Sequence, residues 1–446
     1  MARAAEQFAA SLNLGAFGKA TELKNRLWFT LGALIVYRIG TYIPIPGIDP
    51  VVLDDIFRQQ AGGILGMFDA FAGGALSRMS IFALNVIPYI SASIIMQLMT
   101  AISPSMERLK KEGEAGRKKI NQYTRYLTVL LAVIQGYGMA TGLESLASSQ
   151  GPAVHDPGMF FRATVVITIL GGTMFLMWLG EQITARGVGN GISLIIFAGI
   201  VSAIPTAIAS TLELGRTGAL SALFIIVFLA FAAAVVTFIV FVERAHRRIV
   251  VQYPKRQVGN RMFGGEASHI PLKLNTSGVI PVIFASSLLL APVSVAGFAG
   301  PDSGGVLGTV SAYLGQGQPL FLILYAALIV FFAFFYTAVV FNPEETADNL
   351  KKHGGFVPGI RPGRNTAEYF DYVLTRLTVV GAIYLTVVAL LPEVLRVRFA
   401  LPFYFGGTSL LIVVVVSMDF VSQVQSHLLA HQYEGLIRKS RLKGKR

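Results

Sequence analysis

Residues 320–341 read LFLILYAALIVFFAFFYTAVVF, an apolar run that contains no charged side chain. A helix of this length can cross the roughly 30 Å hydrocarbon core of a lipid bilayer. Residues 220–242 have the same character, and residues 27–43 interrupt it only with Arg38. The chain of 446 residues is 54% hydrophobic and only 14% charged, a composition typical of membrane proteins. The sequence therefore predicts an all-α membrane protein.

Apolar windows of this kind recur along the chain and predict ten transmembrane helices. The predicted spans lie near residues 27–43, 79–102, 126–143, 163–180, 192–208, 220–242, 279–298, 320–341, 377–392 and 404–424. Because the number of spans is even, we expect both termini on the same side of the membrane. The N-terminal 23 residues lack the apolar core of a cleavable signal peptide, so the first span is expected to stay as an anchor.

The basic residues are distributed very unevenly between the two faces that these spans define. The chain carries a formal net charge of +13, and 30 of its 37 Lys and Arg residues lie on the face that also holds both termini. Those residues occupy segments 1–26, 103–125, 181–191, 243–278, 342–376 and 425–446. Cytoplasmic loops of membrane proteins are enriched in Lys and Arg, so both termini are predicted to be cytoplasmic.

The sequence offers no chemistry for catalysis or for a cofactor. It contains no cysteine, which excludes disulfides, thiolate metal sites and iron–sulfur clusters. Gly187, Gly189 and Gly191 lack the spacing of a dinucleotide-binding loop and precede an apolar run, which favours a tight turn. We therefore expect no enzyme activity, no metal site and no cofactor.

Few ionisable residues lie within the predicted spans, namely Arg38 in the first and Asp419 in the last. Ion-coupled transporters generally keep such residues near the middle of the membrane, where they act as functional sites. The scarcity of such residues in the spans disfavours an ion-coupled transporter. A transporter of a small neutral solute remains open. Pro88 in the second span is interpreted as an ordinary helix kink.

Three further segments do not read as simple spans or short turns. Residues 67–80, MFDAFAGGALSRMS, fit either a half-helix folded back into the bundle or an interfacial helix. The long loop 243–278 contains β-branched residues and turn signals that indicate a projecting hairpin. In the other long loop, 342–376, the glycines and prolines of residues 352–365 define turns that present Arg361 at a tip. Both loops are candidate docking surfaces, although solvated loops that only set the topology would read the same way.

Six long stretches of the chain form a recognisable pattern: GTYIPIPGID (40–49), FAGGALSRMSIFALNVIPYISAS (71–93), KEGEAGRKKINQYTRY (111–126), GTMFLMWLGEQITARGVGNGISLIIFAGI (172–200), FNPEETADNLKKHGGFVPGIRPG (341–363) and PFYFGGTSLLIVVVVSMDF (402–420). In these stretches the chain resembles the SecY family of protein-conducting channels. The resemblance implies two five-helix halves related by an inverted pseudo-twofold axis, residues 1–212 and 213–428, followed by a basic cytoplasmic tail, 429–446.

The resemblance also implies a pore with a ring of aliphatic side chains at its waist. The family positions of this ring fall on Val86, Ile90, Ile192, Ile196, Ile283 and Ile412. Val86 departs from the isoleucine that is common in the family. A re-entrant plug half-helix is expected at about residues 64–77, including Phe68, Phe71, Gly73 and Gly74. Spans two and seven are expected to form a lateral gate to the lipid.

The resemblance finally implies a function and a set of partners. We expect a channel subunit that passes unfolded secretory polypeptides across the bacterial plasma membrane and releases transmembrane segments into lipid. The expected partners are SecE, SecG, the SecA ATPase, the ribosome, signal sequences and nascent polypeptides, with Arg361, Lys255 and Arg256 as docking residues. From the residues alone, a neutral-solute transporter and a scaffold subunit without a pore are the alternatives.

Overall fold

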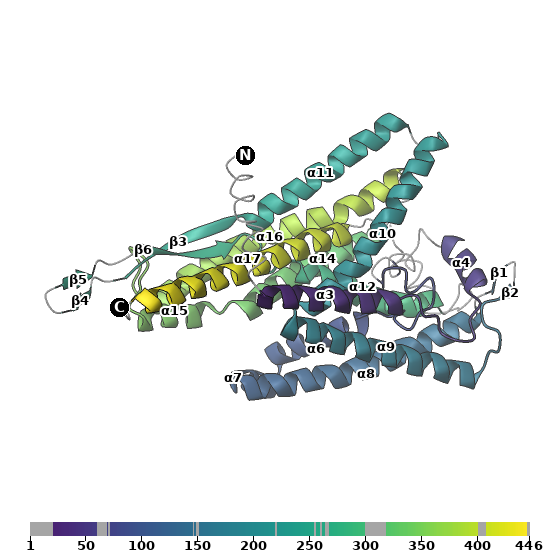
Figure 1. Ribbon diagram of the computed structural model, residues 1–446, viewed down its shortest axis with the longest axis horizontal. Helices are drawn as coiled ribbons and strands as arrows, with labels where there is room; N and C mark the ends of the chain where they lie inside the picture. The colour runs from purple at the N-terminus through teal and green to yellow at the C-terminus, as the bar shows by residue number, and fades with distance from the viewer. Residues whose placement is uncertain are drawn as a thin grey trace.

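The computed structural model of the chain is almost entirely helical, as Figure 1 shows. It describes residues 21–59, 69, 72–145, 147–148, 151–218, 221–253, 256–258, 261–263, 267–298, 318–399 and 407–443. Its helices are α3 (Thr21–Gly40), α4 (Pro50–Gln59), α6 (Ile87–Ile102), α7 (Pro104–Lys111), α8 (Glu114–Ser145), α9 (Met159–Arg186), α10 (Gly191–Arg216), α11 (Ala222–Arg244), α12 (Ile280–Phe298), α14 (Pro319–Val340), α15 (Pro343–Lys352), α16 (Arg364–Phe399) and α17 (Gly407–Lys443). Helices satisfy their own backbone hydrogen bonds, which a lipid environment requires.

Several of these helices are long and apolar enough to span a membrane. Within the described residues seven helical segments meet this condition, or eight if the bent pair α6 and α7 counts as one span. The two helices of that pair meet at 98°. Each predicted span overlaps a helix, although α3, which carries charged residues near both ends, and α12 are not among the seven. The protein is therefore a multi-pass membrane protein.

The helices differ from the predicted spans mainly at their ends. Helix α8 begins at Glu114, α16 begins at Arg364 and α17 runs to Lys443, well beyond their apolar windows. A hydropathy window detects only the apolar part of a helix, whereas Glu, Lys, Arg and Gln continue it in water because their helix propensity is high. The kink predicted at Pro88 is wrong, because α6 begins at Ile87 and Pro88 lies in its first turn, where a missing N–H costs nothing.

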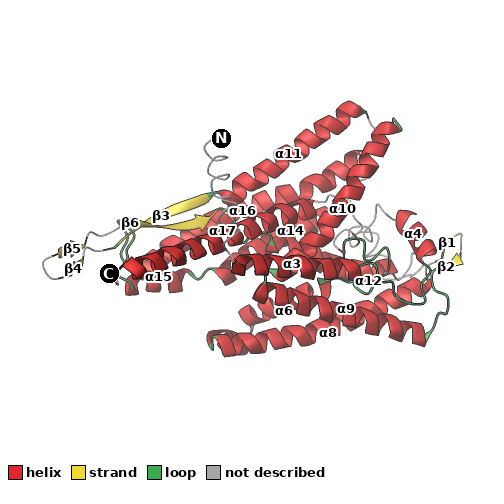
Figure 2. Cartoon of the chain, viewed as in Figure 1, coloured by secondary structure: helices red, strands yellow, loops and turns green. Residues whose placement is uncertain are grey.

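The hairpin predicted in loop 243–278 is confirmed. Strands β3 (His246–Gln252) and β6 (Ala267–Lys273) pair antiparallel, and β4 (Arg256–Val258) pairs with β5 (Arg261–Phe263) beyond them. Figure 2 shows both pairs projecting from one end of the helical bundle. A separate short pair, β1 (Ala147–Ser148) with β2 (Gly151–Pro152), lies at the opposite end. We call the end that carries β3, β6 and α15 the basic end.

The two long loops form one structure at the basic end. The backbone N–H of Gln252 in β3 donates to the carbonyl of Phe356 at 2.9 Å, and the N–H of Phe356 donates back at 3.0 Å. Below this junction, Val251 and Leu272 of the hairpin pack with Phe370 of α16 in a small apolar core. The hairpin is therefore held against the 352–365 loop by backbone pairing and by side-chain burial.

One large apolar core joins most of the bundle. It includes Tyr37 of α3, Ile169 of α9, Ile329 of α14 and Leu411 of α17, all fully buried. Helix α11 contributes little, since only 11% of its apolar window is buried, and it leans away from the bundle in Figure 1. An apolar surface of that extent outside the core is what a lipid-facing helix presents.

Candidate functional site

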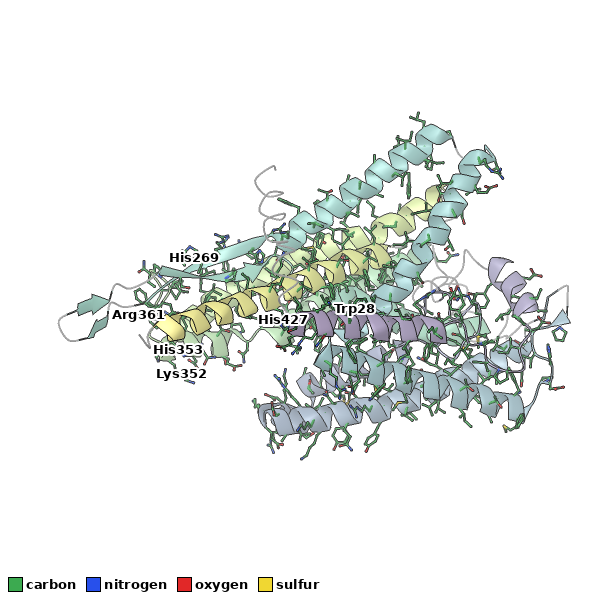
Figure 3. The ribbon with its side chains drawn as sticks, viewed as in Figure 1. Trp28, His269, Lys352, His353, Arg361 and His427 are labelled. Atoms are coloured by element: carbon green, nitrogen blue, oxygen red, sulfur yellow. The ribbon has the colours of Figure 1, made fainter. Side chains whose placement is uncertain are left out.

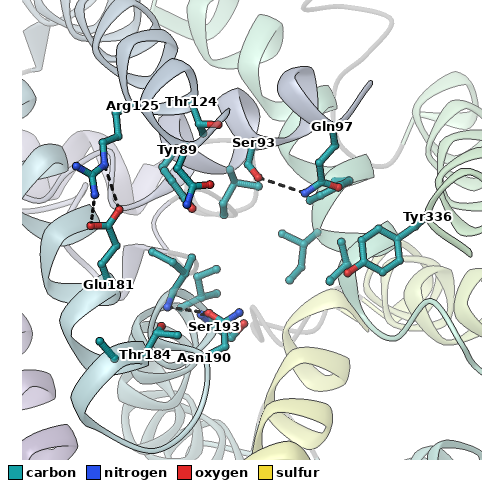
Figure 4. A pocket seen from close by; sticks show the side chains of 18 residues that line it. Tyr89, Ser93, Gln97, Thr124, Arg125, Glu181, Thr184, Asn190, Ser193 and Tyr336 are labelled. Atoms are coloured by element: carbon teal, nitrogen blue, oxygen red, sulfur yellow. Dashed lines mark hydrogen bonds and ion pairs between the residues drawn. The ribbon is translucent and has the colours of Figure 1, made fainter. Parts of the chain in front are cut away.

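A cavity of about 650 Å³ lies between six helices, α6, α8, α9, α10, α12 and α14. Asn121 and Arg125 on the first turns of α8, and Glu181 near the end of α9, lie at its rim. Figure 4 shows Arg125 and Glu181 paired beside the open space. The start of α8 lies towards the basic end in Figure 1, and the side chains of Arg125 and Glu181 are 48% and 36% exposed.

Much of the cavity wall is made of polar side chains. The guanidinium of Arg125 donates to both carboxylate oxygens of Glu181, at 2.6 and 3.3 Å, and joins α8 to α9. On α6, the side-chain amide of Gln97 donates to the Ser93 hydroxyl at 3.3 Å. Asn190 precedes α10 and accepts hydrogen bonds from the first free backbone N–H groups of that helix. Polar groups of this kind can form hydrogen bonds with water or with a polypeptide backbone in the cavity.

The floor of the cavity is apolar and leads to a much narrower space. Ile90, Ile196 and Ile283 line both the large cavity and a second one of about 20 Å³. Val86 and Ile87 complete the apolar lining of the small cavity. A space of that size holds about one water molecule. We call this constriction the waist.

The structure brings most of the predicted ring residues to these two cavities. Val86 lines the small cavity, Ile192 lines the large one, and Ile90, Ile196 and Ile283 line both. Ile412 on α17 lines neither cavity, although it is fully buried in the same apolar core. Ile412 therefore stays a predicted member of the ring.

Three polar residues at the waist were missed by the sequence interpretation. Asn85, Ser286 and Ser287 line the small cavity beside the aliphatic side chains. Ser286 and Ser287 follow Ile283 by three and four residues, so helical spacing could have placed them on its face. Asn85 is buried and has a positive φ of 49°, a conformation that asparagine tolerates better than most residues.

The predicted plug residues are only partly described. Phe68 and Phe71 lie outside the described residues. Gly73 and Gly74 form a turn with φ of +66° and +79°, a region that favours glycine. A Cβ atom on Gly73 would lie 2.7 Å from the Cα of Gly199 in α10, so the backbone approaches that helix closely.

The predicted docking residues lie on the two long loops. Arg361 is exposed in the turn that precedes α16, and its carbonyl accepts a hydrogen bond from the Thr366 hydroxyl at 2.9 Å. Figure 3 shows it at the basic end, near His269 of β6 and His353. Arg256 begins β4, and Lys255 lies outside the described residues.

Comparison with known proteins identifies the family. The model of the SecY family matches residues 80–421. The chain is 58% identical over 428 residues to the protein translocase subunit SecY of Escherichia coli (strain K12), and the match covers 96% of each chain. The chain belongs to the SecY family. A second SecY relative, from Rickettsia conorii, is 56% identical over 422 residues, which cover 95% of this chain and 97% of the relative.

Solved structures share the SecY fold. A protein-conducting channel superimposes with a TM-score of 0.65 at 19% sequence identity and covers 91% of this chain and 92% of its own. Sec61 from the canine ribosome–channel complex gives a TM-score of 0.61 at 18% identity, with the same coverage. The family resemblance predicted from the sequence is therefore confirmed. These SecY relatives give no support to the neutral-solute transporter.

Proposed function

We propose that this chain is the pore-forming subunit of a Sec translocase. It passes unfolded secretory polypeptides across the bacterial plasma membrane and releases transmembrane segments sideways into the lipid. The observation that supports this function best is the wide, partly polar cavity that narrows to an aliphatic waist, from about 650 Å³ to about 20 Å³. No covalent chemistry, cofactor or metal is needed, because threading a chain makes and breaks only non-covalent contacts.

The chemistry of the two cavities explains how a chain can pass. The polar side chains of the wall offer hydrogen bonds to the backbone of an entering polypeptide. Its polar groups therefore keep partners until the chain reaches the waist. Branched aliphatic side chains offer none, and a narrow apolar constriction excludes water and ions when it is empty. A passing chain fills the waist without being bound by it. Val86, Ile90, Ile192, Ile196, Ile283 and Ile412 make up the proposed ring.

Lateral release is proposed at the contact between α6 and α12. Ile90 of α6 and Ile283 of α12 meet at the floor of the same cavity, so separation of these two helices would open the path to lipid. Leu, Ile, Phe and Val favour the membrane interior, each by a few tenths of a kcal/mol. A sufficiently apolar segment of a passing chain would then leave through this gate by its own transfer free energy.

The full topology is part of the proposal. Ten spans form two halves, residues 1–212 and 213–428, related by an inverted pseudo-twofold axis, with the plug near 64–77 and a basic tail at 429–446. Both termini are cytoplasmic. Two observations support this arrangement: each predicted span overlaps a helix, and 30 of the 37 basic residues fall on one face. The open cavity then faces the cytoplasm.

Energy is supplied by partners that dock at the basic end. SecA and the ribosome are the proposed drivers, through Arg361, Lys255 and Arg256, and SecE and SecG complete the complex. The exposed position of Arg361 and the backbone pairing between Gln252 and Phe356 support a single rigid docking surface. Contacts of basic residues with ribosomal RNA should weaken as the salt concentration rises.

Disulfide crosslinking tests the pore directly. The chain has no cysteine, so Ile283→Cys or Ile90→Cys carries the only thiol in it. We expect either thiol to crosslink to a cysteine in a secretory precursor stalled during transit, in the assembled complex. The control is Ile226→Cys on α11, whose side chain is 64% exposed. Failure of both waist positions with an engaged precursor would reject the pore and favour a scaffold subunit.

A further inference from the structure

A turn at residues 72–74 is held by two neighbouring residues of the first long helix. The Tyr37 hydroxyl donates to the carbonyl of Ala72 at 3.3 Å, and Nη1 of Arg38 donates to the carbonyl of Gly73 at 3.0 Å. Tyr37 is fully buried, whereas Arg38 is partly buried. Consecutive residues of α3 therefore bind consecutive carbonyls of the turn.

The same arginine also binds a third element. Nη1 of Arg38 donates to the hydroxyl of Ser202 in α10 at 2.9 Å, and that hydroxyl donates to the carbonyl of Gly199 at 2.6 Å. Gly199 is also the residue on which Gly73 packs. One guanidinium nitrogen thus connects α3, the turn and α10 at a single point, between segments separated by up to 164 positions in the chain.

Hydrogen bonds to Asp69 hold the turn together internally. The carboxylate of Asp69 accepts the backbone N–H groups of Leu76 at 3.0 Å and Ser77 at 2.8 Å, and its carbonyl accepts from Gly74 at 3.0 Å. These internal bonds keep the turn folded but do not fix it to the bundle. The bonds from Tyr37 and Arg38 add a polar attachment to the packing of Ala72 and Leu76 in the large apolar core.

We propose that Arg38, assisted by Tyr37, is a positioning residue that anchors the 72–74 turn on α10. The turn lies in the proposed plug, near its C-terminal end, so the anchor holds the plug in its closed position; this consequence rests on the proposed function. The inference also explains why the first span contains a charged residue. An ionisable residue within a span is costly and is kept where it has a partner and a role.

The test measures how readily the turn opens. Ser77→Cys places a single thiol on the half-buried end of the turn, and its reaction rate with a polar maleimide is measured in the assembled complex. Adding Arg38→Met keeps an unbranched, apolar side chain but removes the guanidinium donors. We expect about a tenfold faster reaction, which corresponds to ~1.4 kcal/mol and is near the value of one hydrogen bond from a charged group. Tyr37→Phe should give a rise of about threefold, because a neutral bond is weaker.

Tyr42→Phe is the matched control. The Tyr42 hydroxyl accepts from the other terminal nitrogen of Arg38, Nη2, at 3.4 Å, whereas the bonds to the turn come from Tyr37 and from Nη1 of Arg38. The control should leave the rate unchanged. Arg38→Lys, which retains a charged donor, should restore the rate to within about threefold of the parent. This variant also covers the case in which Arg38→Met fails to assemble.

Two results would overturn the inference: an unchanged thiol rate in Arg38→Met and Tyr37→Phe, or an equal rise in Tyr42→Phe. The ion current of the same complexes without precursor separates this inference from the proposed function. A faster thiol reaction together with a raised current supports both the anchor and the plug. A faster reaction without added current would leave the anchor standing and refute its role in closing the channel.

Discussion

Ile283 at the waist provides the sharpest test of how the channel excludes water and ions. Its side chain lines both the large cavity and the small one, and only 8% of the residue is exposed. Ile283→Ala removes three carbon atoms from a space that holds about one water molecule. We expect the variant to conduct ions without any precursor, because water enters the enlarged and less apolar waist.

The size of the effect follows from the apolar groups removed. Each buried methylene contributes ~0.8 kcal/mol to the exclusion of water, so three contribute ~2.4 kcal/mol. At about 1.4 kcal/mol per factor of ten, the population of hydrated waists should rise roughly 50-fold. Partial collapse of the neighbouring isoleucines would reduce this value, and a serine at the same position would increase it by adding a hydrogen-bonding group.

The assay is the ion current of purified complexes in planar bilayers, measured with no precursor present. Ile280→Ala is the matched control, because Ile280 lies one turn earlier on α12 and lines the large cavity but not the small one. The control should keep the low parental current. An equal current in the two variants, or no rise in Ile283→Ala, would refute the assignment of the waist as the barrier.

Three other variants test docking and packing. Arg361→Glu should abolish ATPase-driven export and leave the thermal unfolding of the complex unchanged, because the side chain is exposed; normal export would remove this docking residue. Gly172→Ala should lower the free energy of unfolding by ~2 kcal/mol or more, since the new Cβ would lie 1.9 Å from a backbone carbonyl oxygen. Its control is Gly136→Ala, whose Cβ would have no neighbour closer than 3.6 Å, so only a small loss of stability is expected. Glu144→Gln should cost ~1 kcal/mol of stability by breaking a partly buried ion pair of 2.6 Å. Its control is Glu213→Gln, which breaks an exposed ion pair and should change stability little. Equal unfolding temperatures for a variant and its control would contradict this reasoning.

The sequence determined the class of fold because hydropathy acts locally. A run such as 320–341 must be a helix if it lies in lipid, whatever surrounds it, since the backbone has no other way to satisfy its polar groups. The hairpin around β3 and β6 was equally predictable, because β-branched residues and turn signals lie next to each other in the chain. The ends of the helices were not predictable from hydropathy, because polar residues can continue a helix without adding to it.

Locating the waist required both the family resemblance and the tertiary structure. The sequence alone makes Ile90 and Ile196 ordinary apolar residues of two helices, and only the family resemblance selected them. The structure then placed them on one cavity floor and added Asn85, Ser286 and Ser287, which no hydropathy pattern marks. Pore lining depends on how helices are rotated against each other, and that rotation is set by packing between distant segments.

The anchor at Arg38 shows most clearly what could not be predicted from the sequence. The sequence determined that a charged residue lies in the first span and that two glycines follow the amphipathic segment. Only the tertiary structure decided that this guanidinium binds both the Gly73 carbonyl and Ser202, far along the chain. Local propensities and apolar periodicity act within a few residues, whereas a hydrogen bond between distant segments exists only after the helices have packed.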